Sequence, residues 1–112
     1  MWSQERTQVL RVLAEVYLEQ ERPADARVLL RALARLAPED AGVWRALSYA
    51  SLRAQVPEDA LNAADTLLRL ETANPDNAPI LLLRAQALRA LGRAAEAQDS
   101  LNRYLQWRSD AP

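Results

Sequence analysis

Three stretches of the chain repeat one pattern: ERPADARVLLRAL at residues 21–33, QVPEDALNAADTL at 55–67 and GRAAEAQDSLNRY at 92–104. Each stretch opens with turn-forming residues and continues with apolar residues at helical spacing around a shared alanine, which is Ala26, Ala60 or Ala97. Successive copies of this alanine are 34 and 37 residues apart. Repetition at such a period predicts a stack of similar helical units.

Small and large apolar residues recur around these stretches in an order typical of the tetratricopeptide repeat, a helix–turn–helix unit of 34 residues. In the first unit, the apolar positions are Leu10, Leu13, Ala14 and Tyr17 on the first helix, and Ala26, Leu30 and Leu33 on the second. Trp44 and Leu47 follow Leu10 and Leu13 at the same interval in the second unit, where Ser51 replaces an expected aromatic residue.

The chain therefore resembles tetratricopeptide repeat proteins over residues 7–108. This resemblance implies an all-α fold in which six helices form three repeats of a short right-handed superhelical arc. We expect one domain over residues 1–112, with repeats at about 7–38, 41–74 and 78–108.

The ends of the helices can be located from individual residues. Pro23 and Pro57 suit the first turn of a helix, where a missing N–H costs nothing, and Gly92 suits a left-handed C-terminal cap. Asp40 and Asn77 are predicted N-caps. The predicted helices span residues 5–20, 23–36, 41–54, 57–73, 78–91 and 94–108. The three additional residues of the second interval should lengthen the fourth helix or enlarge the loop near residues 71–74.

The composition excludes several classes of chemistry. The chain has 112 residues, a formal net charge of −1, no cysteine and no histidine, which removes thiol nucleophiles, disulfides, zinc fingers and histidine-based catalysis. The N-terminus lacks the apolar segment of a secretory signal, and the longest apolar run, 78–83, is too short to span a bilayer. We expect a soluble, cytoplasmic protein with no cofactor, no metal and no membrane insertion.

Neither enzymatic activity nor nucleic-acid binding is expected. Carboxylates such as Glu15 and Glu19 are neighbours on one exposed helix face, whereas acid–base catalysis needs two acids facing each other across a cleft. The arginines at 27, 31 and 35 form a basic stripe, but they lack interleaved aromatic residues. They are expected to form a solvated outer face that is offset by the nearby Glu39, Glu58 and Asp59.

In tetratricopeptide repeat arcs the first helix of each unit lines a concave groove. By this resemblance the groove is part apolar and part cationic, and it would suit an amphipathic helix or an extended segment. No polar capping helix is expected after the last unit, so Leu105 and Trp107 should form a second, open surface. The candidate partner-binding residues are Arg11, Leu18, Arg45, Tyr49, Leu52, Arg53, Leu82, Gln86, Arg89, Leu105 and Trp107.

The chain also resembles the small tetratricopeptide repeat chaperones of bacterial type III secretion systems, most closely the YscY (SctY) family. The matching stretches are TQVLRVLAEVYLEQ (7–20), ARVLLRALARLAPED (26–40), RAQALRALGRAAEA (84–97) and SLNRYLQWRSDAP (100–112).

This resemblance implies a cytoplasmic chaperone that keeps a small secreted protein of the YscX (SctX) type soluble and helps to present it at the export gate. Two alternatives stay open: a chaperone of the needle subunit (YscG/SctG-like) and a self-associating scaffold.

Overall fold

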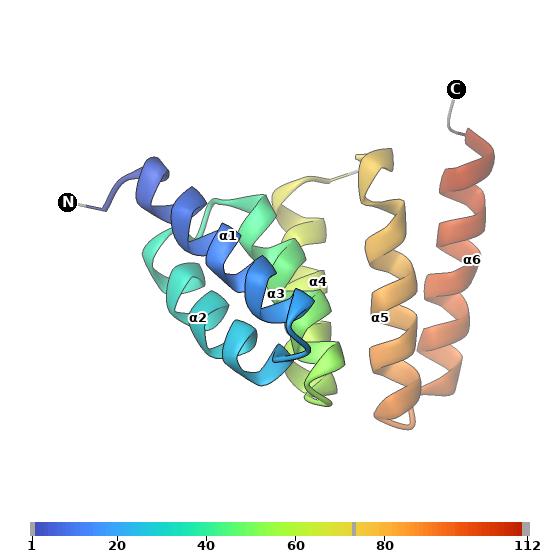
Figure 1. Ribbon diagram of the computed structural model, residues 1–112. Helices are drawn as coiled ribbons and strands as arrows, with labels where there is room; N and C mark the ends of the chain where they lie inside the picture. The colour runs from blue at the N-terminus through green and yellow to red at the C-terminus, as the bar shows by residue number, and fades with distance from the viewer. Residues whose placement is uncertain (1, 73, 111–112) are drawn as a thin grey trace.

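The computed structural model describes residues 2–72 and 74–110, although the side chains of residues 109 and 110 are not described. Within these residues the helices run antiparallel to their neighbours in one continuous row (Figure 1). They are α1 (Gln4–Glu19), α2 (Pro23–Leu36), α3 (Ala41–Arg53), α4 (Pro57–Leu70), the 3-10 helix η1 (Pro75–Asn77), α5 (Ala78–Ala90) and α6 (Ala94–Asp110).

All six predicted α-helices are present, and the fold is an all-α helical repeat. The largest difference is in α4, which ends at Leu70. The additional residues of the second interval therefore enlarge the loop, where Pro75–Asn77 form η1. Residue 73, where the fourth helix was expected to end, lies outside the described residues.

Small residues let the helices of each unit approach closely. The shared alanine of the three stretches, Ala26, Ala60 or Ala97, is at most 2% exposed in every unit. The facing position on the first helix holds Ala14, Ser48 or Ala85, which are equally buried. Leucines such as Leu30, Leu67 and Leu88 fill the space around them, which removes apolar surface from water along the whole row.

The turn inside each unit has the same backbone geometry. Glu21, Gln55 and Gly92 hold equivalent positions after α1, α3 and α5, and all three have a positive φ, of 59°, 64° and 76° respectively. In each case the following amide N–H donates to a carbonyl five residues earlier, as in Arg93 N to Leu88 O at 2.8 Å. The predicted left-handed cap at Gly92 is confirmed, and it recurs at two residues that have a side chain.

The predicted N-caps differ in outcome. Pro23 and Pro57 begin α2 and α4, and the Asp40 side chain accepts a hydrogen bond from Val43 N, as expected. Asn77 precedes α5, but its side chain does not cap that helix. The Asn77 side chain is buried instead, where it accepts a hydrogen bond from Arg45 (2.8 Å) and donates one to Glu71 (3.0 Å).

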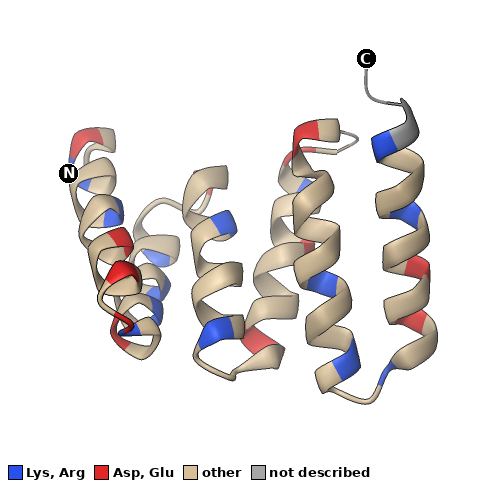
Figure 2. Cartoon of the chain, turned by 45° about the vertical axis from the view of Figure 1, so that its right-hand side comes forward, with Lys and Arg blue, Asp and Glu red and all other residues tan. Residues whose placement is uncertain are grey.

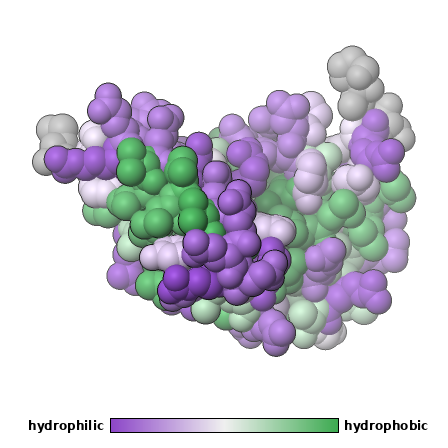
Figure 3. Space-filling view, in the orientation of Figure 1, coloured by the Kyte–Doolittle hydropathy of each residue, from purple (hydrophilic) through white to green (hydrophobic). Residues whose placement is uncertain are grey.

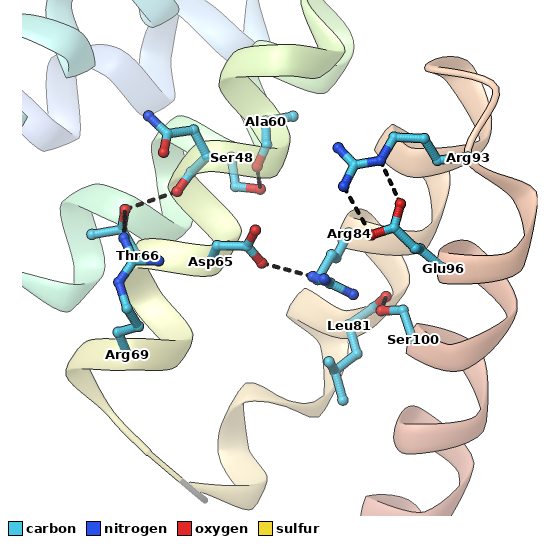
Figure 4. Close-up of polar contacts among 11 residues, drawn as sticks. Ser48, Ala60, Asp65, Thr66, Arg69, Leu81, Arg84, Arg93, Glu96 and Ser100 are labelled. Carbon is cyan, nitrogen blue, oxygen red and sulfur yellow. Dashed lines mark hydrogen bonds and ion pairs between the residues drawn. The ribbon is translucent and has the colours of Figure 1, made fainter.

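Buried polar bonds join helices within and between units (Figure 4). The Ser48 hydroxyl donates to the Ala60 carbonyl at 2.9 Å, and the Ser100 hydroxyl donates to the Leu81 carbonyl at 2.8 Å. Arg84 of α5 donates to Asp65 of α4 at 2.7 Å, which joins the second unit to the third.

The basic stripe on α2 is not simply solvated. Arg27 donates to Asp59 of α4 with two nitrogens, and only 20% of its side chain is exposed. Arg31 also approaches Asp59. These contacts join the first unit to the second, and the expected offset of the stripe by Asp59 is present, although Arg27 is only partly exposed.

Candidate protein-binding site

The first helices of units one and two line a shared groove. This groove has a volume of about 710 Å³ and lies between α1 and α3. It contains five of the predicted binding residues, Arg11, Leu18, Arg45, Tyr49 and Arg53. The remaining lining residues are Glu15, Glu19, Glu21, Gly42 and Ala46.

The predicted residues of the third unit are not part of this groove. Leu82, Gln86 and Arg89 lie on α5 and do not line the groove. Leu52 packs against the buried cluster around Leu61 and Leu88, between α3 and the third unit. Leu52 therefore contributes to the core and does not line the groove.

The groove arginines are already engaged by the protein itself. Arg53 donates to the Glu21 carboxylate at 2.7 Å and to the Tyr49 hydroxyl at 3.1 Å. The hydrogen bond to Tyr49 and the nearby Glu21 raise the pKa of Arg53 above its ordinary value. Arg45 contacts Glu71 and Asn77 of the loop before α5.

Arg11 extends across the start of α3 toward Asp40, with its Nη1 3.7 Å from the carboxylate. Gly42 makes room for it, because a Cβ at residue 42 would lie 1.9 Å from that same Nη1. The three arginines face three glutamates on the groove walls, Glu15, Glu19 and Glu21. The groove lining thus contains three arginines and three glutamates beside its apolar residues.

A second hollow continues from the groove toward the N-terminus. It has a volume of about 660 Å³ and shares Arg11, Gly42 and Arg45 with the groove. Trp2 lines it and is held by a hydrogen bond from its indole N–H to the Thr7 hydroxyl at 2.6 Å. Trp2 is not among the predicted binding residues. An aromatic residue just ahead of a predicted helix could have indicated that it packs at the start of that helix.

Charges are distributed unevenly around the groove (Figure 2). The two charged residues of α3 are Arg45 and Arg53, whereas α1 carries Glu5, Glu15 and Glu19 beside Arg6 and Arg11. Among the described residues, none of the three α1 carboxylates forms an ion pair.

Leu105 and Trp107 do not form one surface. They are two residues apart on α6, so their side chains point to different sides of the helix. Leu105 is 58% exposed, whereas Trp107 is half-buried and Arg103 lies over its ring at 5.7 Å. Of these two residues, Leu105 is therefore the one with most of its side chain exposed.

Comparison with protein families identifies the repeat. The tetratricopeptide repeat family model matches residues 7–50, which comprise the first unit and most of α3. Residues 7–50 are therefore similar to a tetratricopeptide repeat, and the fold of the described residues is an all-α helical repeat. Repeats of this kind are scaffolds for protein–protein interaction.

No curated protein matches the chain. None of the helices in the described residues is long and apolar enough to cross a membrane.

Proposed function

We propose that the chain is a non-enzymatic module that binds an amphipathic segment of another protein in the groove between α1 and α3. The observation that carries the proposal is an exposed apolar strip inside a polar groove. Tyr49 is 41% exposed and Leu18 is half-buried, and both line the groove between its arginines and glutamates. An amphipathic helix could pack on these two side chains while its polar residues meet the charged walls.

The finer proposal is that of a cytoplasmic type III secretion chaperone. It is supported by the resemblance of four stretches, which lie between residues 7 and 112 and together make up half of the chain, to the YscY (SctY) family. The client would be a small secreted protein of the YscX (SctX) type. Burying the apolar face of the client would keep it soluble until it reaches the export gate. Such clients order on binding, so the affinity is what remains after the entropic cost of ordering.

A chaperone of the needle subunit is the neighbouring alternative, and the nature of the client would separate the two. A self-associating scaffold is favoured by one observation, the exposed apolar side chains of α1 (among them Val9 and Val12). Light scattering on the purified chain tests the scaffold directly, because the chaperone proposal predicts a monomer at micromolar concentration.

The test is co-expression with the products of adjacent genes, followed by size-exclusion chromatography with light scattering. A small, otherwise insoluble neighbour that co-elutes in a defined complex supports the chaperone. Tyr49→Asp should weaken that complex at least about tenfold, because it places a charge among the apolar contacts.

Val28→Asp is the matched control, since Val28 is exposed on α2 and lines neither the groove nor the hollow beside it. Circular dichroism checks that both variants remain helical. Equal binding by the wild type and Tyr49→Asp would exclude the groove as the binding site.

A further inference from the structure

The outer side of α1 carries an apolar face that the sequence analysis assigned in part to the core. Val9, Val12, Leu13 and Val16 follow one another at helical spacing, and all four are exposed, from 68% at Val9 to 37% at Val16. Leu13 was expected inside the first unit but is 40% exposed. Figure 3 shows the hydrophobic area over α1 at the left of the molecule. We call these four residues the α1 face.

The repeat shows what such a face does elsewhere in the chain. At the repeat interval of 34 residues, the positions equivalent to Val9, Leu13 and Val16 are Val43, Leu47 and Ala50 of α3. These three are at most 5% exposed and pack in one cluster with Leu30, Leu33 and Ala34 of α2. On α3 these positions therefore form an interface with the preceding helix, α2. On α1 the equivalent positions are not covered by any described residue.

The internal interface also has a polar component. Arg27 and Arg31 of α2 contact Asp59 at the start of α4, and a small seam between α2, α3 and α4 is lined by Arg31, Ala34, Leu47 and Asp59. Asp25 holds the position equivalent to Asp59 in the first unit. The Asp25 side chain is 51% exposed, and among the described residues its only ion pair is with the neighbouring Arg22. The first unit thus has the apolar positions on α1 and the carboxylate on α2 that would form an interface with a helix like α2.

We propose that the α1 face together with Asp25 is a second docking site, and that its occupant is a basic amphipathic helix of a partner protein. This helix would present leucine and alanine to Val9 and Leu13, as α2 presents them to Val43 and Leu47. An arginine pair four residues apart would reach Asp25, as Arg27 and Arg31 reach Asp59. The unpaired carboxylates of Glu5, Glu15 and Glu19 on α1 add to the attraction of a basic partner. This site does not depend on the groove proposal.

A second copy of the chain fits this site poorly. The α6 residues equivalent to Arg27 and Arg31 are Gln98 and Asn102, which hydrogen-bond to each other at 3.1 Å and cannot pair with Asp25 as arginines would. The alternative, a two-fold antiparallel pairing of α1 with itself, would cover the α1 face but would bring no arginine pair four residues apart to Asp25, because the two arginines of α1, Arg6 and Arg11, are five residues apart. Such a pairing is the competing outcome of the test below.

The chain supplies its own probe, because α2 is the helix that covers the equivalent face. A fluorescently labelled peptide of residues 23–36, acetylated and amidated, would be titrated with the full-length chain by fluorescence polarisation. We expect saturable binding below about 1 mM that weakens as salt is added. A peptide with glutamate at its three arginine positions should not bind.

Matched variants locate the site. Val9→Asp should weaken peptide binding at least about tenfold, whereas Val28→Asp, at 65% exposure against 68% for Val9, should leave it unchanged. Asp25→Asn should reduce both the affinity and its salt dependence. Equal binding by the wild type and Val9→Asp would overturn the proposal, because the peptide would then have exchanged with α2 or bound elsewhere. A homodimer that Val9→Asp dissociates would also overturn it, since a second copy would then occupy the face.

Discussion

At the scale of single residues, two serines show how the same side chain can stabilise or weaken the stack. Ser48 and Ser51 lie one helical turn apart on α3, and both are fully buried. The Ser48 hydroxyl donates to the Ala60 carbonyl, whereas the Ser51 hydroxyl has no hydrogen-bond partner among the described residues. Ser51 is equivalent to Tyr17 and Leu88, which fill the same position in the other units. A buried hydroxyl without a partner costs free energy that an apolar side chain would not.

Ser51→Ala should therefore raise the free energy of unfolding by about 1 kcal/mol, because it removes an unsatisfied polar atom. Ser48→Ala is the matched control and should lower the free energy of unfolding by about 1 kcal/mol, because it deletes a hydrogen bond at equal burial. Urea titration followed by circular dichroism measures both changes. Destabilisation of equal size by the two variants would mean that Ser51 does form a hydrogen bond in solution.

At the scale of the elements, the three turns inside the units test how much glycine matters at a left-handed position. Glu21, Gln55 and Gly92 share a positive φ and the same hydrogen bonds, but only Gly92 adopts this conformation without strain from a Cβ. Glu21 gains from its ion pair with Arg53, whereas the uncharged side chain of Gln55 forms no hydrogen bond with the described residues. Gln55 is therefore the turn residue whose replacement has the clearest outcome.

Gln55→Gly should raise the free energy of unfolding by about 0.5–1 kcal/mol, since the relief of strain exceeds the entropy that glycine adds to the unfolded chain. The reverse change, Gly92→Gln, should lower it by a similar amount. No heavy atom lies within 4 Å of a Cβ at residue 92, so the backbone conformation alone would set that cost. Thermal unfolding of the two variants measures both values. Stabilisation by Gly92→Gln would contradict the argument.

The elements were largely predictable from the sequence, because hydrophobic spacing, proline and glycine report local structure directly. The α2 helix begins at Pro23 and ends at Leu36, as the pattern indicated. The site was less predictable because it depends on contacts between units. Leu52 packs against the third unit, and the long side chains of Arg45 and Arg53 reach acceptors that no local spacing reveals. Leu13 matches a buried position of the repeat but lies on a helix that no described helix precedes.

At the scale of the whole molecule, the apolar interior is divided into clusters that follow the stack. One cluster joins α1, α2 and α3 and includes Ala63 of α4, and another joins α4, α5 and α6. A small third cluster of Ala64, Leu67 and Ile80 connects α4 to α5. The helices from α2 to α5 each have a neighbouring helix on both sides. The first and last helices, α1 and α6, have a neighbouring helix of the described residues on one side only (Figure 1). Stability in such a stack comes from each unit and its nearest neighbours, so the local free energy of opening should fall toward both ends.

This division predicts where a core substitution will act. Ile80 is 2% exposed and packs against Leu67 across the junction of the second and third units. Ile80→Ala should lower the free energy of unfolding by about 2–5 kcal/mol, because it leaves a cavity at that junction. In hydrogen exchange, the amides of α5 and α6 should lose most of their protection, while those of α1 and α2 keep theirs, because nearest-neighbour coupling confines the loss to the weakened junction. Leu30→Ala, a buried change in the first cluster, is the control and should reverse this pattern. An equal loss of protection in all six helices, in either variant, would instead mean that the stack opens as a single cooperative unit.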